Sequence, residues 1–132
     1  MIDRNLFRET ILNFVKENSK ILAINDNKTF DNFLPLSLDL RYLIDLKNND
    51  YVKQNEFDIV ILENQNFVAT DISLHLKKGG HFVTMQKEID ELPSFNLENI
   101  VEHLEDNSFR IVKCDQDYDE KGKNIFYILA KK

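Results

Sequence analysis

The sequence predicts an α/β domain with a mainly parallel sheet of about six strands. Two short, strongly apolar runs, ILAI at 21–24 and FDIVIL at 57–62, are typical of strands that helices bury on both faces. Amphipathic helical segments alternate with strand-like runs along the chain, which favours parallel strands joined by crossover helices. The last two strand-like segments, within 109–131, are joined by a short turn, so they form a hairpin and the final strand is antiparallel.

The first half of the chain is expected to begin with a helix over residues 4–18. Its apolar side chains recur at helical spacing with charged residues between them: Phe7, Ile11, Phe14 and Val15. The strand at 21–24 follows, and then a short helical turn over 28–36 that ends near Pro35. Residues 40–44 give a weaker strand signal.

The second half carries stronger signals. The run at 57–62 should be a central strand, because it is the most apolar segment of the chain. A helix follows, for which Thr70 is a candidate N-cap. Gly79 is expected in the left-handed conformation just past the end of this helix.

The remaining elements complete the alternation. Residues 81–85 form the next strand, and Asn96 can cap a helix whose apolar stripe is Leu97, Ile100, Val101 and Leu104. Gly122 supplies the turn of the closing hairpin. Cys114 lies in the first hairpin strand and is expected to be buried there.

The bulk composition sets the class of protein. A chain of 132 residues fits one domain, 1–132. The net charge of -6 repels phosphate backbones, so we expect no nucleic-acid partner. No apolar run approaches the ~20 residues that span a bilayer and no signal-peptide layout is present, so we expect a cytoplasmic protein without a membrane partner.

Metal and phosphate-loop sites are not expected. The single cysteine and the spacing of His75, His81 and His103 do not form a metal-binding pattern. The chain has three glycines, Gly79, Gly80 and Gly122. Neither the dinucleotide fingerprint nor the P-loop can be written with glycines at these positions.

The segment LKKGGHFVTM, 76–85, resembles the turn that precedes a sheet strand in class I S-adenosylmethionine-dependent methyltransferases, with Lys78 in place of proline. The following helix and hairpin, 96–132, also resemble the end of that family. The resemblance covers about 75 residues from Phe57 onward. It implies a Rossmann-like three-layer sandwich whose last strand is inserted antiparallel into the sheet.

The first half departs from the family pattern. Asn25, Asp26 and Asn27 follow the first strand where the family carries an acidic residue and G-x-G. If the site is functional, the resemblance implies that these residues and Asp45, at the position of the ribose-binding acid, hold S-adenosylmethionine. Side chains at 25–27 would hinder the close backbone approach that glycine permits. Asp45 and Phe57 are only 12 positions apart, so the strand that contacts adenine is expected to be missing.

Glu63 and Asn64 end the central strand and are the candidates to face a methyl acceptor, although the asparagine-proline-proline loop of amino-methylating enzymes is absent. We therefore predict a shortened methyltransferase-like domain with a degenerate cofactor motif, which serves as a non-catalytic binding or interaction module. A truncated sheet exposes edges, so a protein partner or self-association is expected.

Two alternatives stay open at this point. One is an active small methyltransferase with an atypical cofactor loop, since backbone amides and Asn or Asp side chains can hold a polar cofactor. The other is a degenerate receiver-like signalling domain, which the order KILAINDN and FDIVILEN also resembles. That alternative requires Asp26 and Glu63 side by side in a small acidic pocket.

Overall fold

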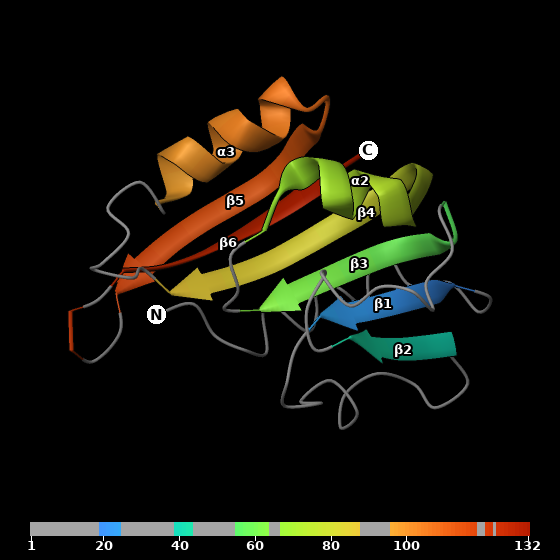
Figure 1. Cartoon of the computed structure of the whole chain (residues 1–132). Coiled ribbons are helices and arrows are strands. Elements are labelled where there is room, and N and C mark those ends of the chain that lie inside the picture. Colours follow the sequence, from blue (N-terminus) through green and yellow to red (C-terminus); the bar gives the residue numbers. More distant parts are fainter. Residues whose placement is uncertain are drawn as a thin grey trace.

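A computed structural model describes residues 19–24, 39–43, 55–63, 67–87, 96–118, 121, 122 and 124–132. The predicted helix at 4–18 and the helical turn at 28–36 lie outside these residues. Within the described part, the chain forms a six-stranded sheet flanked by two helices (Figure 1). The strands are β1 (Lys20–Ile24), β2 (Asp39–Leu43), β3 (Phe57–Glu63), β4 (Leu76–Lys87), β5 (Arg110–Tyr118) and β6 (Asn124–Lys131).

The strand order is β2-β1-β3-β4-β6-β5. The first four strands in this order pair in parallel, and β6 pairs antiparallel with both of its neighbours, β4 and β5. This arrangement confirms the mainly parallel sheet of six strands and the hairpin that inserts its last strand antiparallel. It also confirms that the strand beginning at Phe57 is central.

Both faces of the central strands are buried. The helices α2 (Ala69–His75) and α3 (Leu97–Asp106) cover one face, where their apolar side chains pack in one cluster with those of β1, β3, β4 and β6 (Figure 1). The opposite face is as deeply buried, with exposed fractions of 0–2% for Ile21, Ile59, Ile61, Val83, Tyr127 and Leu129. The central strands therefore contribute side chains to the buried core on both faces. Within the described residues, no helix has the length and apolar character needed to cross a membrane.

Helix α3 has the predicted cap and stripe. The Asn96 side chain accepts a hydrogen bond from the backbone N–H of Asn99 at 2.9 Å. Ile100 and Leu104 are buried, and Leu97 and Val101 pack against the core. The helix is thus held by its own N-cap and by its apolar face.

The predicted cap of α2 is wrong. The N-cap is Val68, which makes no side-chain cap bond, and Thr70 lies inside the helix. Instead, His103 of α3 reaches over, and its Nε2 accepts a hydrogen bond from the backbone N–H of Ala69 at 2.9 Å. One of the unpaired donors at the start of α2 is therefore satisfied by a residue of the other helix, which local sequence does not reveal.

Helix α2 is also shorter than predicted. It ends at His75, and β4 begins at Leu76, which pairs with Phe57. Pairing then shifts register and resumes at His81 opposite Ile59. Gly79 does have the predicted positive φ of 83°, but it lies within this irregular start of β4 rather than directly past the helix.

Candidate functional site

The carboxyl ends of the parallel strands meet at one edge of the sheet. Ile24, the last residue of β1, lies opposite Leu43 of β2 and Leu62 of β3. Glu63, the last residue of β3, lies opposite Met85 of β4. In open α/β sheets, ligands bind beyond the carboxyl ends of the strands. We call this edge the carboxyl edge.

In the sequence, the predicted site residues end or follow the strands whose carboxyl ends meet at this edge. Residues 25–27 directly follow β1, Asp45 comes two positions after β2, and Asn64 directly follows β3. These five residues lie outside the described part of the chain. Glu63 is described as the end of β3, but its side chain is not. The roles assigned to these six side chains stay predictions.

The three glycines lie away from the connection after β1. Gly79 and Gly80 are at the start of β4, at the opposite edge of the sheet, and Gly122 has a φ of 78° between β5 and β6. Residues 25–38, which join β1 to β2, contain no glycine. The sequence of this connection therefore offers no glycine at which a cofactor could approach the backbone without meeting a Cβ.

A buried polar pair in β4 was not predicted. Gln86 and Thr84 have no exposed surface, and the Gln86 Nε2 donates a hydrogen bond to the Thr84 Oγ1 at 2.7 Å. They lie near the carboxyl edge, since Met85 between them is opposite Glu63. The signal in the sequence was two polar residues at i and i+2 in an apolar strand, which places them on one face. Their mutual bond offsets part of the desolvation of the two side chains.

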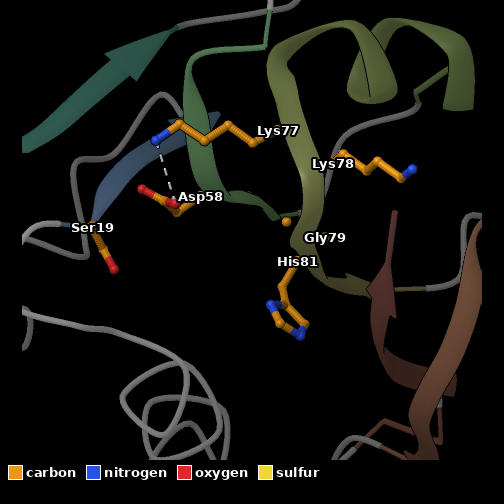
Figure 2. A pocket seen from close by; sticks show the side chains of 7 residues that line it. Ser19, Asp58, Lys77, Lys78, Gly79 and His81 are labelled. Carbon is orange, nitrogen blue, oxygen red and sulfur yellow. Dashed lines mark ion pairs between the residues drawn. The ribbon is translucent and has the colours of Figure 1, made fainter.

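The opposite, amino edge of the sheet carries a hollow of about 160 Å³ (Figure 2). Its lining residues come from the segment before β1, from β3 and from the start of β4: Ser19, Asp58, Lys77, Lys78, Gly79, Gly80 and His81. Figure 2 shows Lys77 directed toward Asp58, whereas Lys78 points away from it. None of the predicted site residues lines this hollow.

The contacts in the hollow hold the starts of three strands together. The Asp58 Oδ2 accepts a hydrogen bond from the backbone N–H of Lys20 at 2.9 Å, and its Oδ1 lies 3.6 Å from the Lys77 Nζ. The Lys20 Nζ in turn lies 3.5 Å from the Glu56 Oε1. Asp58 of β3 thus contacts both β1 and β4 at the amino edge.

Replacing Gly80 with alanine should lower the free energy of unfolding by about 1–3 kcal/mol, the range for overpacking a tight interior. A Cβ at this position would lie 2.8 Å from the Lys77 carbonyl oxygen and 3.1 Å from that of Asp58, and backbone atoms cannot move aside easily. Urea unfolding followed by circular dichroism measures the change.

The matched control is Gly79→Asn. This position has nothing within 4 Å of a built Cβ, and asparagine is among the residues that adopt a positive φ with the least strain. We expect a smaller loss than for Gly80→Ala. Equal losses would contradict the steric explanation.

The pKa of His81 is lowered from its ordinary value of 6.5, first by burial and second by the positive charge of Lys131. Lys131 is its cross-strand partner on β6. The folded state therefore binds a proton at His81 less readily than the unfolded chain does. The resulting stability is fully present above pH 6.5 and is lost as the pH falls from 6.5 toward the lowered pKa.

We expect His81→Gln to remove part of the loss of stability that wild type shows on acidification. The check is a set of urea unfolding curves for both proteins across a pH series that brackets 6.5. Lys131→Met should produce a partial effect in the same direction, because it removes only the secondary cause. Superimposable pH profiles for wild type and His81→Gln would show that His81 does not contribute.

Comparison with known proteins gives a fold and no sequence family. No protein-family model matches the chain, and no curated protein matches its sequence. Many solved structures match its fold.

A 1,6-didemethyltoxoflavin-N1-methyltransferase from Burkholderia thailandensis, solved with bound S-adenosylhomocysteine, superposes with a TM-score of 0.71 at 14% identity. The match covers 96% of this chain and 76% of that one. An rRNA methylase from Streptococcus thermophilus matches over 100% of this chain and 98% of its own, with a TM-score of 0.67 and 12% identity. The [4+2]-cyclase SpnF matches with a TM-score of 0.67 and 11% identity, over 97% of this chain and 80% of its own.

The domain therefore has a class I S-adenosylmethionine-dependent methyltransferase-like, Rossmann-like fold. The matches extend over nearly the whole chain, so the likeness is not limited to the second half, where the sequence resemblance lies. The receiver-like alternative does not fit this sheet, because a receiver has the doubly wound parallel order 2-1-3-4-5. Here the fifth position is taken by β6, which runs antiparallel.

Proposed function

We propose that this protein is a non-catalytic binding or interaction module built on the methyltransferase fold. The observation that carries the proposal is the placement of the glycines. All three lie at the start of β4 or in the β5–β6 turn, and none lies in the connection between β1 and β2. In the methyltransferase fold, the connection after β1 is where the backbone must approach the cofactor closely.

The chemistry explains why this connection matters. The sulfonium of S-adenosylmethionine is already a strong electrophile, so a methyltransferase contributes mainly by binding the cofactor and aligning it with a nucleophile. A connection that carries Asn25, Asp26 and Asn27 presents side chains where glycine leaves the backbone open. In this proposal the glycine-free connection does not admit the cofactor, so we assign no catalytic step to Glu63 or Asn64.

The fold itself is compatible with a role other than methyl transfer. One of the matching structures is a [4+2]-cyclase by name. Function resides in the residues of a site and not in the fold that carries it. The residues after β1 are therefore the part of this chain that decides between the alternatives.

An active small methyltransferase is the second candidate. It is supported by the bound S-adenosylhomocysteine of the Burkholderia thailandensis methyltransferase, whose fold this chain shares. In this alternative, Asn25, Asp26, Asn27 and Asp45 hold the cofactor through side-chain oxygens and backbone amides. Glu63 and Asn64 then face the acceptor.

We expect no increase in melting temperature when the protein is titrated with S-adenosylmethionine or S-adenosylhomocysteine in a thermal-shift experiment. A ligand that binds only the folded state stabilises it by about 2.7 kcal/mol at 100 times its dissociation constant. A saturable increase with both compounds would overturn the non-catalytic proposal. In that case, two variants should abolish the increase in melting temperature: Asp45→Ala, and a protein with alanine at 25–27.

A further inference from the structure

Strand β5 has an exposed and chemically unusual edge. It stands at one end of the strand order, and in the described part of the chain its strand partner is β6. Cys114 was expected to be buried, but it is exposed, because the strand lies at the edge of the sheet. Val112 and Tyr118 are 45% and 60% exposed. An edge strand presents unpaired N–H and C=O groups, which are a template for another strand.

We propose that β5 pairs antiparallel with β5 of a second copy of this chain, with the two-fold axis midway between the two copies of Cys114. Two identical antiparallel strands in one sheet are related by a two-fold axis perpendicular to the sheet, which keeps every side chain on its own face. Side chains of facing residues lie on the same face of the sheet. One residue must therefore face its own copy across the axis. Only registers centred on a residue are therefore available.

Charge selects among these registers. Centring on Cys114 places Lys113 of each copy opposite Asp115 of the other, which gives two opposite-charge pairs. Moving the centre one residue back places Lys113 against its own copy. Moving it one residue forward places Lys113 opposite Asp117 but sets Asp115 against its own copy. Like charges directly opposite each other are destabilising, so the register centred on Cys114 is favoured over both neighbours.

Lys113 and Asp115 are placed where a second copy could reach them. Lys113 and Asp115 are exposed and lie opposite Leu129 and Tyr127 of β6, on one face of the sheet. The Lys113 Nζ lies 6.0 Å from the centre of the Tyr127 ring, so the charge is held close to the sheet. Cys114 lies opposite Ile128, whose side chain belongs to the cluster that the helices cover. The two cysteines would therefore meet on that face.

The pairing is expected to be short and reversible. The register of β5 against β6 shifts between Ile111 and Lys113, and such an irregularity bends an edge strand and limits its pairing. Pairing centred on Cys114 keeps the triplet 113–115 clear of the shift. The proposal is independent of whether S-adenosylmethionine binds, since β5 is separated from β1 and β3 by β4 and β6.

Sedimentation velocity of the full chain tests the charge pairing. We expect wild type to show a concentration-dependent dimer, Lys113→Glu to be monomeric, and the charge-swapped Lys113→Glu/Asp115→Lys protein to dimerise again. Since each copy carries a net charge of -6, the runs belong at about 0.15 M ionic strength, where the Debye length is about 8 Å. A wild type that stays monomeric at its solubility limit, or a dimer that Lys113→Glu does not weaken, would overturn the proposal.

Disulfide trapping tests the register. Cα atoms of facing residues in antiparallel strands are about 4.5–5.5 Å apart, which a disulfide can bridge. Diamide, which accepts the two electrons and two protons of a thiol pair, should crosslink wild type through Cys114. In the Cys114→Ser background, Lys113→Cys protein mixed with Asp115→Cys protein should crosslink to its partner faster than either does to itself. Equal rates would show that the copies are not paired in this register, and the proposal would fail.

Discussion

Replacing Phe82 with alanine should lower the free energy of unfolding by about 3–5 kcal/mol, the range for removing a fully buried aromatic side chain. Phe82 has no exposed surface and sits in β4, between Val60 of β3 and Ala130 of β6. Its ring centre lies 5.1 Å from that of Phe67, which precedes α2, and 6.2 Å from that of Phe109, which follows α3. The side chain therefore joins the central strands to both helices.

Urea denaturation of wild type, Phe82→Ala and Phe67→Ala measures this effect. Phe67 makes the same ring contact but is only partly buried, so its replacement should cause a smaller loss. Small domains have total stabilities of about 5–15 kcal/mol, so Phe82→Ala should retain only about 0–2 kcal/mol if the domain lies at the low end of that range. A Phe82→Ala protein as stable as wild type would contradict the placement of the core.

Replacing Lys132 with methionine should lower the free energy of unfolding by about 1.5–3 kcal/mol, the range for a hydrogen bond to a charged group. The Lys132 Nζ donates to the carbonyl oxygens of Ser73 at 2.6 Å and Leu76 at 2.8 Å. It also donates to the Asn55 Oδ1 at 3.2 Å. These carbonyls lie at the C-terminal end of α2, where a positive charge is favourable; the Ser73 oxygen also accepts from the backbone N–H of Leu76, the C-cap residue.

Lys131→Met is the matched control for Lys132→Met at pH values above 6.5. Lys131 is the adjacent lysine on β6, but it is exposed. Its charge lowers the pKa of His81, and this affects stability only below pH 6.5. We expect its replacement to change the unfolding midpoint in urea much less. If the two variants lose the same stability, the contacts of Lys132 at the end of α2 are not what stabilises the fold.

The parts of the fold that local patterns determine were predictable. The strands at ILAI and FDIVIL follow from apolar runs, and the hairpin follows from two strand-like segments around Gly122. The cap at Asn96 is likewise a local signal, because the side chain bonds to a backbone N–H three residues away.

Features that depend on distant residues were not predictable. The start of α2 is capped by His103, 34 positions further along the chain, and its end is bound by Lys132, 59 positions from Ser73. The exposure of Cys114 depends on β5 being the edge strand, which sequence spacing alone does not give.

The candidate site was predictable at the level of strand ends only. The sequence placed 25–27 and Glu63 after neighbouring strands, and the structure places β1 and β3 side by side in parallel. The buried pair of Thr84 and Gln86 is not predicted, because the strand at 81–85 is recognised by its apolar residues. Side-chain positions in the connections depend on loop packing, for which strand patterns carry no information.

The most direct test of the central claim is an amide ¹H–¹⁵N NMR titration with S-adenosylhomocysteine that follows the resonances of Ile24, Leu43 and Glu63, the last residues of β1, β2 and β3. These amides lie at the carboxyl edge, and the experiment detects weak binding as well as tight binding. We predict that their resonances stay unchanged throughout the titration. Saturable shifts that concentrate at these three residues, and leave the amides of β5 unaffected, would show that the edge holds the cofactor and would contradict the account.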